Sequence, residues 1–281
     1  MKRHDKLPLK KAYYRIFTGM IVIPLVLVLV LSLVILGMQY REQAIENIRG
    51  VQKGVAAELQ SDVDFMSMRL SQLINVNDNM VIQYAVAMNE ADQDARYDAQ
   101  KKLDQAGNMV IEPVKDVVSI GFYMKNGNAF FLKSSIKRTI EETRAKQWYQ
   151  DALQNLNSVK IGSYQTRKAS DLYLGGSRDQ LVLIYALSPN SMIDRSQSVE
   201  MVVLYQTSDA GNAIRNYNRN YIRGNNKLGI MQIVGENGEA IYKTEEIAVK
   251  AARGYTCVRT PIELENATWS VSYTHLTLPT T

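Results

Sequence analysis

The sequence predicts an α+β fold in which a long N-terminal helix is followed by two consecutive units of strands and helices. Three observations predict it. Residues 16–38 form an apolar run without a formal charge. A helical spacing of apolar residues follows this run and continues to residue 73. Finally, a strand, turn, strand pattern occurs twice, with Asn-Gly at residues 126–127 and again at 237–238.

Composition limits the functions that this chain can have. The 281 residues are 46% hydrophobic and 22% charged, which is enough apolar material for one or two packed domains. The net charge of +5 comes from residues 1–15, where six basic residues stand against one acid. The rest of the chain therefore sums to zero. Since a nucleic-acid binder needs a basic face on its folded part, no nucleic-acid partner is expected. The six basic residues are Lys2, Arg3, Lys6, Lys10, Lys11 and Arg15.

Cysteine and histidine are scarce. Cys257 is the single cysteine, and the two histidines are His4 and His275, near the two ends. An internal disulfide is impossible, and catalytic triads or metal sites centred on histidine lack their main residue in the body of the chain. We expect no catalytic residue, no metal ligand and no cofactor in these residues.

The apolar run at residues 16–38 is predicted to be a membrane anchor. At 1.5 Å per residue it extends about 35 Å, which is enough to cross a hydrocarbon core of about 30 Å. A cleaved signal peptide is the alternative, but its apolar region is shorter and the sequence at residues 36–40 is a poor cleavage site. Because the basic residues precede the run, the positive-inside rule places residues 1–15 in the cytosol and the chain after residue 40 outside the cell membrane.

A long stalk helix is predicted to follow. Apolar residues recur there at steps of three and four, and no proline lies between Leu25 and Glu112. This stripe either packs on its own domain or also pairs with a second subunit, since both use the same residues. A second helix is expected at Met80–Met88, and residues 89–106 are expected to form an exposed helix or a helix with a connector. The stripe consists of Ile48, Val51, Val55, Leu59, Val63, Met66, Leu70 and Leu73.

Two hairpins are predicted from β-branched and aromatic runs that flank Asn126-Gly127 and Asn237-Gly238. We expect type I′ turns with Asn and Gly at the central positions, because that turn needs positive φ at both. The expected hairpin strands are Val117–Met124, Ala129–Leu132, Gly229–Val234 and Ala240–Tyr242. The other expected elements are a helix around Glu141–Leu156 and strands at Gln180–Leu187, Glu200–Gln206 and Thr256–Thr260.

This layout resembles the double Cache sensor region of bacterial transmembrane receptors. The resemblance covers roughly residues 10–270, and the phrases LINVNDNMVIQYAV and SIGFYMKNGNAFFL look most like YesM-type sensor histidine kinases. It implies two tandem PAS-like (Cache) α+β units, and a second membrane span, a HAMP linker and a kinase module beyond them. The implied division is a cytosolic tail 1–15, a transmembrane helix 16–38, a stalk and its continuation 39–88, a membrane-distal unit 89–222 and a truncated membrane-proximal unit 223–270.

The C-terminal residues 271–281 resemble a translated sequencing adapter over about ten consecutive positions. We therefore expect the native sequence to stop near Ser270, and the chain to be an N-terminal fragment. The alternative is that VSYTHLTL is a native strand, because valine, tyrosine and leucine are common in strands.

The resemblance also implies where a ligand binds, between the sheet of the distal unit and the segments that cover it. Amino-acid-binding Cache domains have an Arg-x-Trp-Tyr stretch at a similar place, whereas this chain has Lys146-Gln147-Trp148-Tyr149. Lysine supplies a point charge in place of the guanidinium fork, which puts amino-acid specificity in doubt. Asp209 does not match the family's acid, because it lies at the end of its strand. The candidate ligand-binding residues are Tyr123, Arg144, Lys146, Trp148, Tyr149, Tyr164 and Tyr185.

The sequence thus predicts an extracytoplasmic sensor that binds a small molecule or a peptide, forms a homodimer and signals to a response regulator through a kinase module outside these residues. A chemoreceptor or a cyclic-dinucleotide enzyme uses the same kind of front end and stays an alternative. So does a membrane-tethered binding protein without signalling output. An anchored hydrolase is disfavoured by the absence of histidine from the body of the chain.

Overall fold

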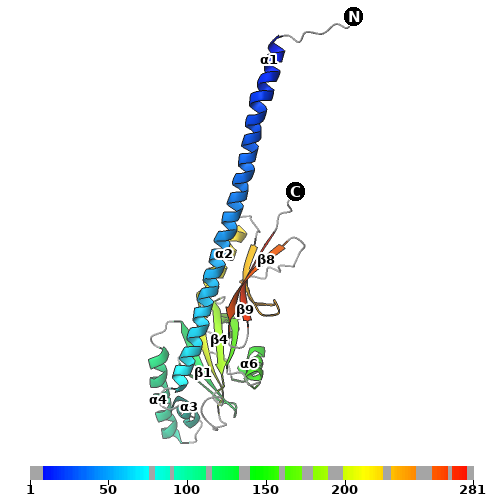
Figure 1. The fold of residues 1–281 in the computed structure, drawn as a ribbon. Coiled ribbons are helices and arrows are strands. Elements are labelled where there is room, and N and C mark those ends of the chain that lie inside the picture. The colour runs from blue at the N-terminus through cyan, green and yellow to red at the C-terminus, as the bar shows by residue number, and fades with distance from the viewer. Residues whose placement is uncertain are drawn as a thin grey trace. The chain divides into compact units, whose positions relative to one another are not determined.

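The computed structural model of the chain describes residues 9–75, 80–88, 92–111, 116–132, 140–157, 162–172, 180–188, 199–223, 229–244, 255–264 and 268–276. The chain consists of two compact units, Met1–Val51 and Gln52–Thr281. Each unit is described separately below. Figure 1 shows the labelled elements.

The first unit is helical throughout its described part. Helix α1 (Leu9–Phe17) leads into a short π-helical segment, η1 (Thr18–Val22), and then into the beginning of α2 (Ile23–Asn75). In the π-helical segment, the backbone amide of Ile23 donates to the carbonyl of Thr18. Pro24 explains this widening, because it has no N–H to give to the carbonyl four residues earlier and its ring needs space there.

The large apolar side chains between Ile16 and Met38 are exposed along the whole helix. A helix with this length and composition satisfies the requirement for crossing a membrane, and the predicted span at residues 16–38 lies inside it. In a chain of otherwise ordinary composition, such a continuous apolar surface needs a nonaqueous environment or a partner.

In the second unit, the remaining part of α2 is a core helix. Val55, Leu59, Val63, Met66 and Leu70 are buried and belong to the main hydrophobic core, together with residues of both sheets. The predicted helical stripe is therefore confirmed as far as its spacing is concerned, and from Val55 onward it packs on its own chain. Pairing of this stripe with a second subunit would require the same buried side chains.

Two further helices follow α2. Helix α3 (Met80–Ala87) lies where the second helix was predicted, and α4 (Gln93–Ile111) covers most of the polar stretch. Helix α4 is not exposed on all sides, because Ala99, Leu103 and Ala106 are buried. These three residues are spaced at four and three positions, so they lie on one face of the helix.

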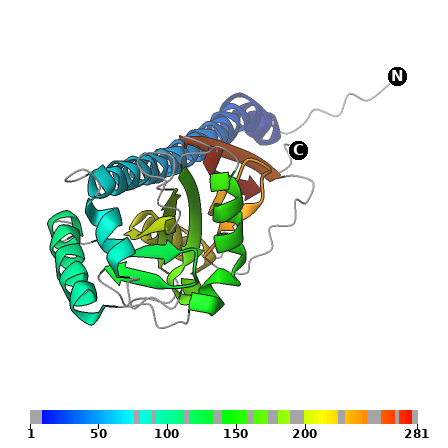
Figure 2. The same cartoon turned by 90° about the horizontal axis from the view of Figure 1, so that it is seen from below.

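A five-stranded antiparallel sheet forms the centre of the second unit. Its order is β2-β1-β5-β4-β3, and its strands are β1 (Val117–Met124), β2 (Ala129–Leu132), β3 (Gly162–Lys168), β4 (Leu181–Leu187) and β5 (Val199–Ser208). Alternate residues of the central strands face two different cores. One core contains the α2 stripe, and the other contains residues of helix α6 (Gln147–Asn157). Figure 2 shows helices on both sides of the sheet.

A second, four-stranded antiparallel sheet has the order β7-β6-β9-β8. Its strands are β6 (Gly229–Val234), β7 (Ala240–Tyr242), β8 (Tyr255–Glu263) and β9 (Thr268–Leu276). Strand β9 continues past Ser270 and lies between two partners, with Val271 and Tyr273 buried. The predicted non-native tail thus begins inside this sheet, and its adapter origin stays a prediction.

The α+β class, the long N-terminal helix and the two successive antiparallel sheets are confirmed. The single helix expected around Glu141–Leu156 is instead two helices, α5 (Ile140–Arg144) and α6, separated by Ala145 and Lys146. Strand β3, helix α7 (Ala169–Leu172) and helix α8 (Ala210–Arg223) were not predicted. Strand β3 has a mostly polar sequence, GSYQTRK, so apolar alternation gives little signal for it. Helix α8 does have apolar residues at helical spacing, namely Ala210, Ala213, Ile214 and Tyr217, and this pattern was missed.

Both predicted hairpins form, but their turn type is different from the expected one. In the first hairpin Gly127 N–H donates to the carbonyl of Met124, so the central residues are Lys125 and Asn126. In the second, Gly238 N–H donates to the carbonyl of Gly235 in the same way. The two glycines follow the turn with φ of 100° and 77°. A three-residue loop with a left-handed glycine at its end also matches the strand twist, and this explains why the type I′ prediction was wrong.

Candidate functional site

A buried aromatic cluster lies between the five-stranded sheet and helix α6. Tyr123 comes from β1, Tyr205 from β5, and Trp148 and Tyr149 from the first turn of α6. Each of these four side chains is at most 4% exposed. Their rings meet edge to face, with centroids 5.1 Å apart for Tyr123 and Tyr149 and 6.0 Å apart for Trp148 and Tyr205. Such contacts are favoured by the aromatic quadrupoles.

Polar groups are concentrated at one end of this cluster. The hydroxyl of Tyr149 donates to Glu200 Oε2 at 2.6 Å, and Arg144 Nη2 donates to the same oxygen at 3.0 Å. Arg144 also donates to the carbonyl of Met124. The Arg144 and Glu200 side chains remain 26% and 20% exposed, so this ion pair borders solvent. The Nε of Arg144 is buried without a hydrogen-bond partner among the described residues.

A second polar contact lies deeper in the cluster, where the hydroxyls of Tyr123 and Tyr205 are 2.7 Å apart. Burial raises the pKa of both phenols well above the ordinary value for tyrosine. Burial also raises the pKa of Tyr149, and the neighbouring Glu200 carboxylate raises it further. All three phenols therefore stay protonated over the physiological range, because the charged form is disfavoured by desolvation. Tyr149 donates to Glu200, and one hydroxyl of the Tyr123–Tyr205 pair donates to the other.

Four of the seven predicted ligand-binding residues meet here, namely Tyr123, Arg144, Trp148 and Tyr149. Lys146 lies between α5 and α6 and contributes through its backbone, since its carbonyl accepts from the amides of Tyr149 and Gln150. Tyr164 and Tyr185 lie on the opposite face of the sheet, where their rings stack with centroids 4.4 Å apart. A role of any of the seven in ligand binding stays a prediction.

Sequence reasoning missed Glu200 and Tyr205. Glu200 was treated only as the first residue of an expected strand, although it is the one acid in the apolar run VEMVVLY. A charged residue in such a strand must find a partner or remain near water. That rule singles out Glu200 but does not identify its partners, because Arg144 and Tyr149 are more than fifty positions away along the chain.

The described residues offer no catalytic constellation and no metal site. No group of three or more His, Cys, Asp or Glu side chains among them has the geometry to hold a metal ion. Cys257 is exposed, and its Sγ lies 3.1 Å from Ser272 Oγ. The chemistry present in the aromatic cluster is one guanidinium, one carboxylate and three phenols, which suits binding of a small polar molecule.

No family model and no curated protein matches this chain. Several solved structures have a similar arrangement of elements. The ligand-binding domain of the Pseudomonas fluorescens chemoreceptor CtaA, in complex with L-serine, has a TM-score of 0.42 and 15% identity, covering 84% of this chain and 98% of that one. The ligand-binding domain of the Pseudomonas aeruginosa PAO1 amino acid chemoreceptor PctB, in complex with L-Arg, has a TM-score of 0.48 and 11% identity, covering 82% and 94%.

The extracellular domain of the putative histidine kinase vpHK1S-Z8 has a TM-score of 0.46 and 9% identity, covering 84% of this chain and 95% of that one. These similar structures are thus extracellular or ligand-binding domains of chemoreceptors and histidine kinases. Because these TM-scores are below 0.5, the function proposed below rests on the geometry of this chain.

Proposed function

We propose that this chain is the ligand-sensing region of a membrane-anchored bacterial receptor. One observation carries the proposal: the Arg144–Glu200 ion pair borders solvent at the end of a buried aromatic cluster. Paired charges set among aromatic walls form a site that orients a small polar ligand. The exposed apolar helix in the first unit supplies a membrane anchor for it.

The proposed ligand is a zwitterion, such as an amino acid or the end of a short peptide. Arg144 would bind its carboxylate through the guanidinium, whose Nε has no partner among the described residues. Glu200 would bind its ammonium group. Arg144 would thereby supply the guanidinium that the Arg-x-Trp-Tyr stretch of amino-acid-binding Cache domains has at the position of Lys146.

A thermal-shift screen of the full chain in lipid nanodiscs tests this proposal, with the twenty amino acids and di- and tripeptides as probes. A specific binder raises the unfolding temperature, because it binds the folded state alone. The shift should disappear in Glu200→Gln and in Trp148→Ala. Gln147→Ala is the control, because Gln147 is exposed on the same helix and its side chain donates to Asp151, outside the aromatic cluster. A shift that persists in Glu200→Gln would show that the ligand binds elsewhere.

We also propose that residues 1–15 are cytosolic and that the chain after residue 40 is extracytoplasmic. The exposed Cys257 is the single cysteine and makes this testable in intact cells. A membrane-impermeant maleimide should label the unmodified chain but not Cys257→Ser. In the Cys257→Ser background, Lys2→Cys should be labelled only after the cells are broken. Labelling of Lys2→Cys in intact cells would reverse the orientation.

The proposed receptor is a YesM-type sensor histidine kinase that acts as a homodimer on a response regulator, with the residues of the two sheets as its membrane-distal and membrane-proximal Cache units. Cross-linking and phosphotransfer assays on the product of the complete gene test this. A chemoreceptor would be methylated instead, and a cyclic-dinucleotide enzyme would form nucleotide product. A binding protein without output would show none of these activities.

A further inference from the structure

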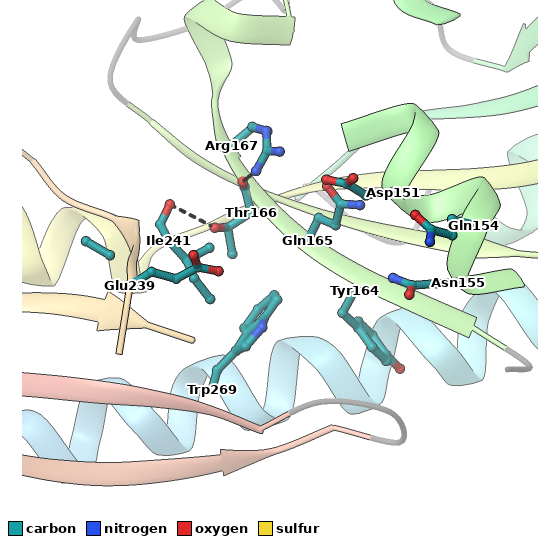
Figure 3. A pocket seen from close by; sticks show the side chains of 11 residues that line it. Asp151, Gln154, Asn155, Tyr164, Gln165, Thr166, Arg167, Glu239, Ile241 and Trp269 are labelled. Carbon is teal, nitrogen blue, oxygen red and sulfur yellow. Dashed lines mark hydrogen bonds between the residues drawn. The ribbon is translucent and has the colours of Figure 1, made fainter. Parts of the chain in front are cut away.

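A cavity lies where the two sheets meet, beside helix α6. Strand β3 is an edge of the five-stranded sheet and β7 is an edge of the four-stranded sheet. The two edges adjoin, since the hydroxyl of the buried Thr166 donates to the carbonyl of Ile241 at 3.4 Å. Beside this contact is a cavity of about 530 Å³, a size typical of small-molecule sites. Figure 3 shows the side chains around it.

The polar part of the lining comes from three elements. Helix α6 contributes Asp151, Gln154 and Asn155, whose spacing places them on one helix face. Strand β3 contributes Gln165 and Arg167 from the five-stranded sheet, and the β7 hairpin contributes Glu239 from the other sheet. Carboxylates, amides and a guanidinium together present both hydrogen-bond donors and hydrogen-bond acceptors.

Two aromatic rings complete the lining. Trp269 of β9 points into the space between the sheets, and Tyr164 of β3 lies on the other side of the cavity. Tyr164 is held by stacking on Tyr185. Trp269 is only 4% exposed and belongs to the main core, so its position is fixed by packing. The cavity thus has a mainly polar lining, with two aromatic rings held in place beside it.

The charge of the lining disfavours an anion. Asp151 and Glu239 face one cation, Arg167. Arg167 is not available as a free cation, because it donates to the Thr166 carbonyl at 2.7 Å and the carboxylates of Asp151 and Asp171 act on it electrostatically. A ligand without negative charge, with several groups that both donate and accept, satisfies this lining best.

We infer that the cavity between β3 and β7 is a second binding site, and that it takes a neutral saccharide. A sugar ring has an apolar C–H face that packs on an aromatic ring, and hydroxyls that pair with carboxylates and amides. Because the lining comes from both sheets, a bound sugar contacts the two sheets at once and ties their edges together. This inference does not rest on the function proposed for the aromatic cluster.

The two tryptophans of the chain allow the two sites to be observed separately, since Trp148 lies in the aromatic cluster and Trp269 lines the cavity. The full chain is placed in lipid nanodiscs, which avoids sugar-headed detergents. Glucose, galactose, xylose, cellobiose and maltose serve as probes, with glucuronate as the anionic comparison. In Trp148→Phe, at least one neutral sugar should change the Trp269 emission saturably. In Trp269→Phe, the Trp148 emission should respond less, because the Trp148 ring lies in the aromatic cluster and its carbonyl adjoins the lining by accepting from Gln165 Nε2 at 2.8 Å.

Asp151→Asn should weaken the sugar response about 10- to 100-fold, which corresponds to the loss of a hydrogen bond to a charged group. Asp171→Asn is the matched control, because Asp171 also acts on Arg167 but does not line the cavity. It should leave the affinity unchanged. The inference is overturned if no neutral sugar changes the Trp269 emission, if Asp151→Asn and Asp171→Asn behave alike, or if glucuronate binds more tightly than glucose. Glu200→Gln should leave sugar binding intact, so failure of one site is distinguishable from failure of the other.

Discussion

The hydroxyls of Tyr123 and Tyr205 form a buried polar pair, with their oxygens 2.7 Å apart. The two residues are 82 positions apart in the chain, and both rings are almost fully buried. Each hydroxyl thus avoids being buried unpaired, which would be costly. The pair joins two neighbouring strands, β1 and β5, in the core that contains residues of α6.

Tyr205→Phe should lower the free energy of unfolding by about 1–3 kcal/mol, because it leaves the Tyr123 hydroxyl buried without its partner. The double change Tyr123→Phe with Tyr205→Phe should recover most of that loss, since both polar groups are then removed. Urea unfolding of the single and double variants measures this coupling. Tyr97→Phe, at a tyrosine that is 73% exposed, is the control. Additive losses in the double variant would contradict the pairing.

Among the elements, the hairpin loops depend on one glycine each. Gly127 has φ of 100° and no atom within 4 Å of the position where a Cβ would lie. A substitution there therefore changes backbone strain and little else. The same is not true of Gly238, where a Cβ would approach the guanidinium of Arg259.

Gly127→Ala should lower the free energy of unfolding by about 1–2 kcal/mol, the penalty for placing an L side chain in the left-handed region. Gly54→Ala is a matched control, because Gly54 is exposed in α2 and also has free space around it. That change should raise stability by about 0.5–1 kcal/mol. Thermal or urea unfolding of both variants measures the difference, and equal effects would disprove the assigned turn geometry.

In the second unit, helix α2 has a buried face and an exposed face. Two residues, one on each face, allow this difference to be tested. Leu70 is fully buried, whereas Met68 is 46% exposed. Leu70→Ala should lower the free energy of unfolding by about 2–5 kcal/mol through the cavity it leaves. Met68→Ala should change it by less than about 0.5 kcal/mol. If instead Met68→Ala weakens self-association of the full chain in sedimentation experiments, the exposed face is the one used by a second subunit.

At the scale of the whole molecule, a carboxylate couples α2 to the five-stranded sheet. Asp62 accepts from Ser208 Oγ at 2.5 Å and from Gln206 Nε2 at 3.3 Å. Burial raises the pKa of Asp62, and the nearby Asp116 and Asp209 raise it further, against the hydrogen bonds from Ser208 and Gln206. Burial and Asp62 also raise the pKa of Glu58, one helical turn away. A raised folded-state pKa stabilises the fold below the unfolded value, here about 3.8 for Asp62, and that stability is lost as the pH rises through the folded value.

Asp62→Asn should therefore remove this loss and be more stable than the unmodified chain at neutral pH. The asparagine amide can also donate to Gln206 Oε1, which is buried without a partner among the described residues. That contact is worth about 1 kcal/mol, or about 2–4 °C in unfolding temperature for a domain of this size. Melting curves from pH 3 to pH 8 measure it. If the stability difference between Asp62→Asn and the unmodified chain does not grow in favour of the variant from pH 3 to pH 7, the argument is contradicted.

Many of the helices and strands were predictable, because the spacing of apolar residues along the chain indicates which face of an element is buried. The α2 stripe, the central strands β1, β4 and β5, and both hairpins follow from apolar spacing and from Asn-Gly. Strand β3 was not predicted, because its sequence is mostly polar and does not alternate between apolar and polar residues. Helix α8 was missed although its apolar residues have helical spacing. The turn type was wrong for a similar reason: Asn-Gly indicates positive φ, but the hydrogen bonds decide which residues are central.

For this protein, the sequence alone determined the apolar N-terminal helix, the order of helices and strands, and the aromatic and cationic residues from which a site is built. These depend on local propensity and on spacing along the chain. Only the tertiary structure decided which of those residues meet. It joined Arg144 to Glu200, paired Tyr123 with Tyr205, moved Tyr164 and Tyr185 to the other face of the sheet, and brought the edges of two sheets together around a cavity. Such contacts connect residues that are far apart in the chain. They depend on the order of the strands in each sheet, which local sequence does not determine.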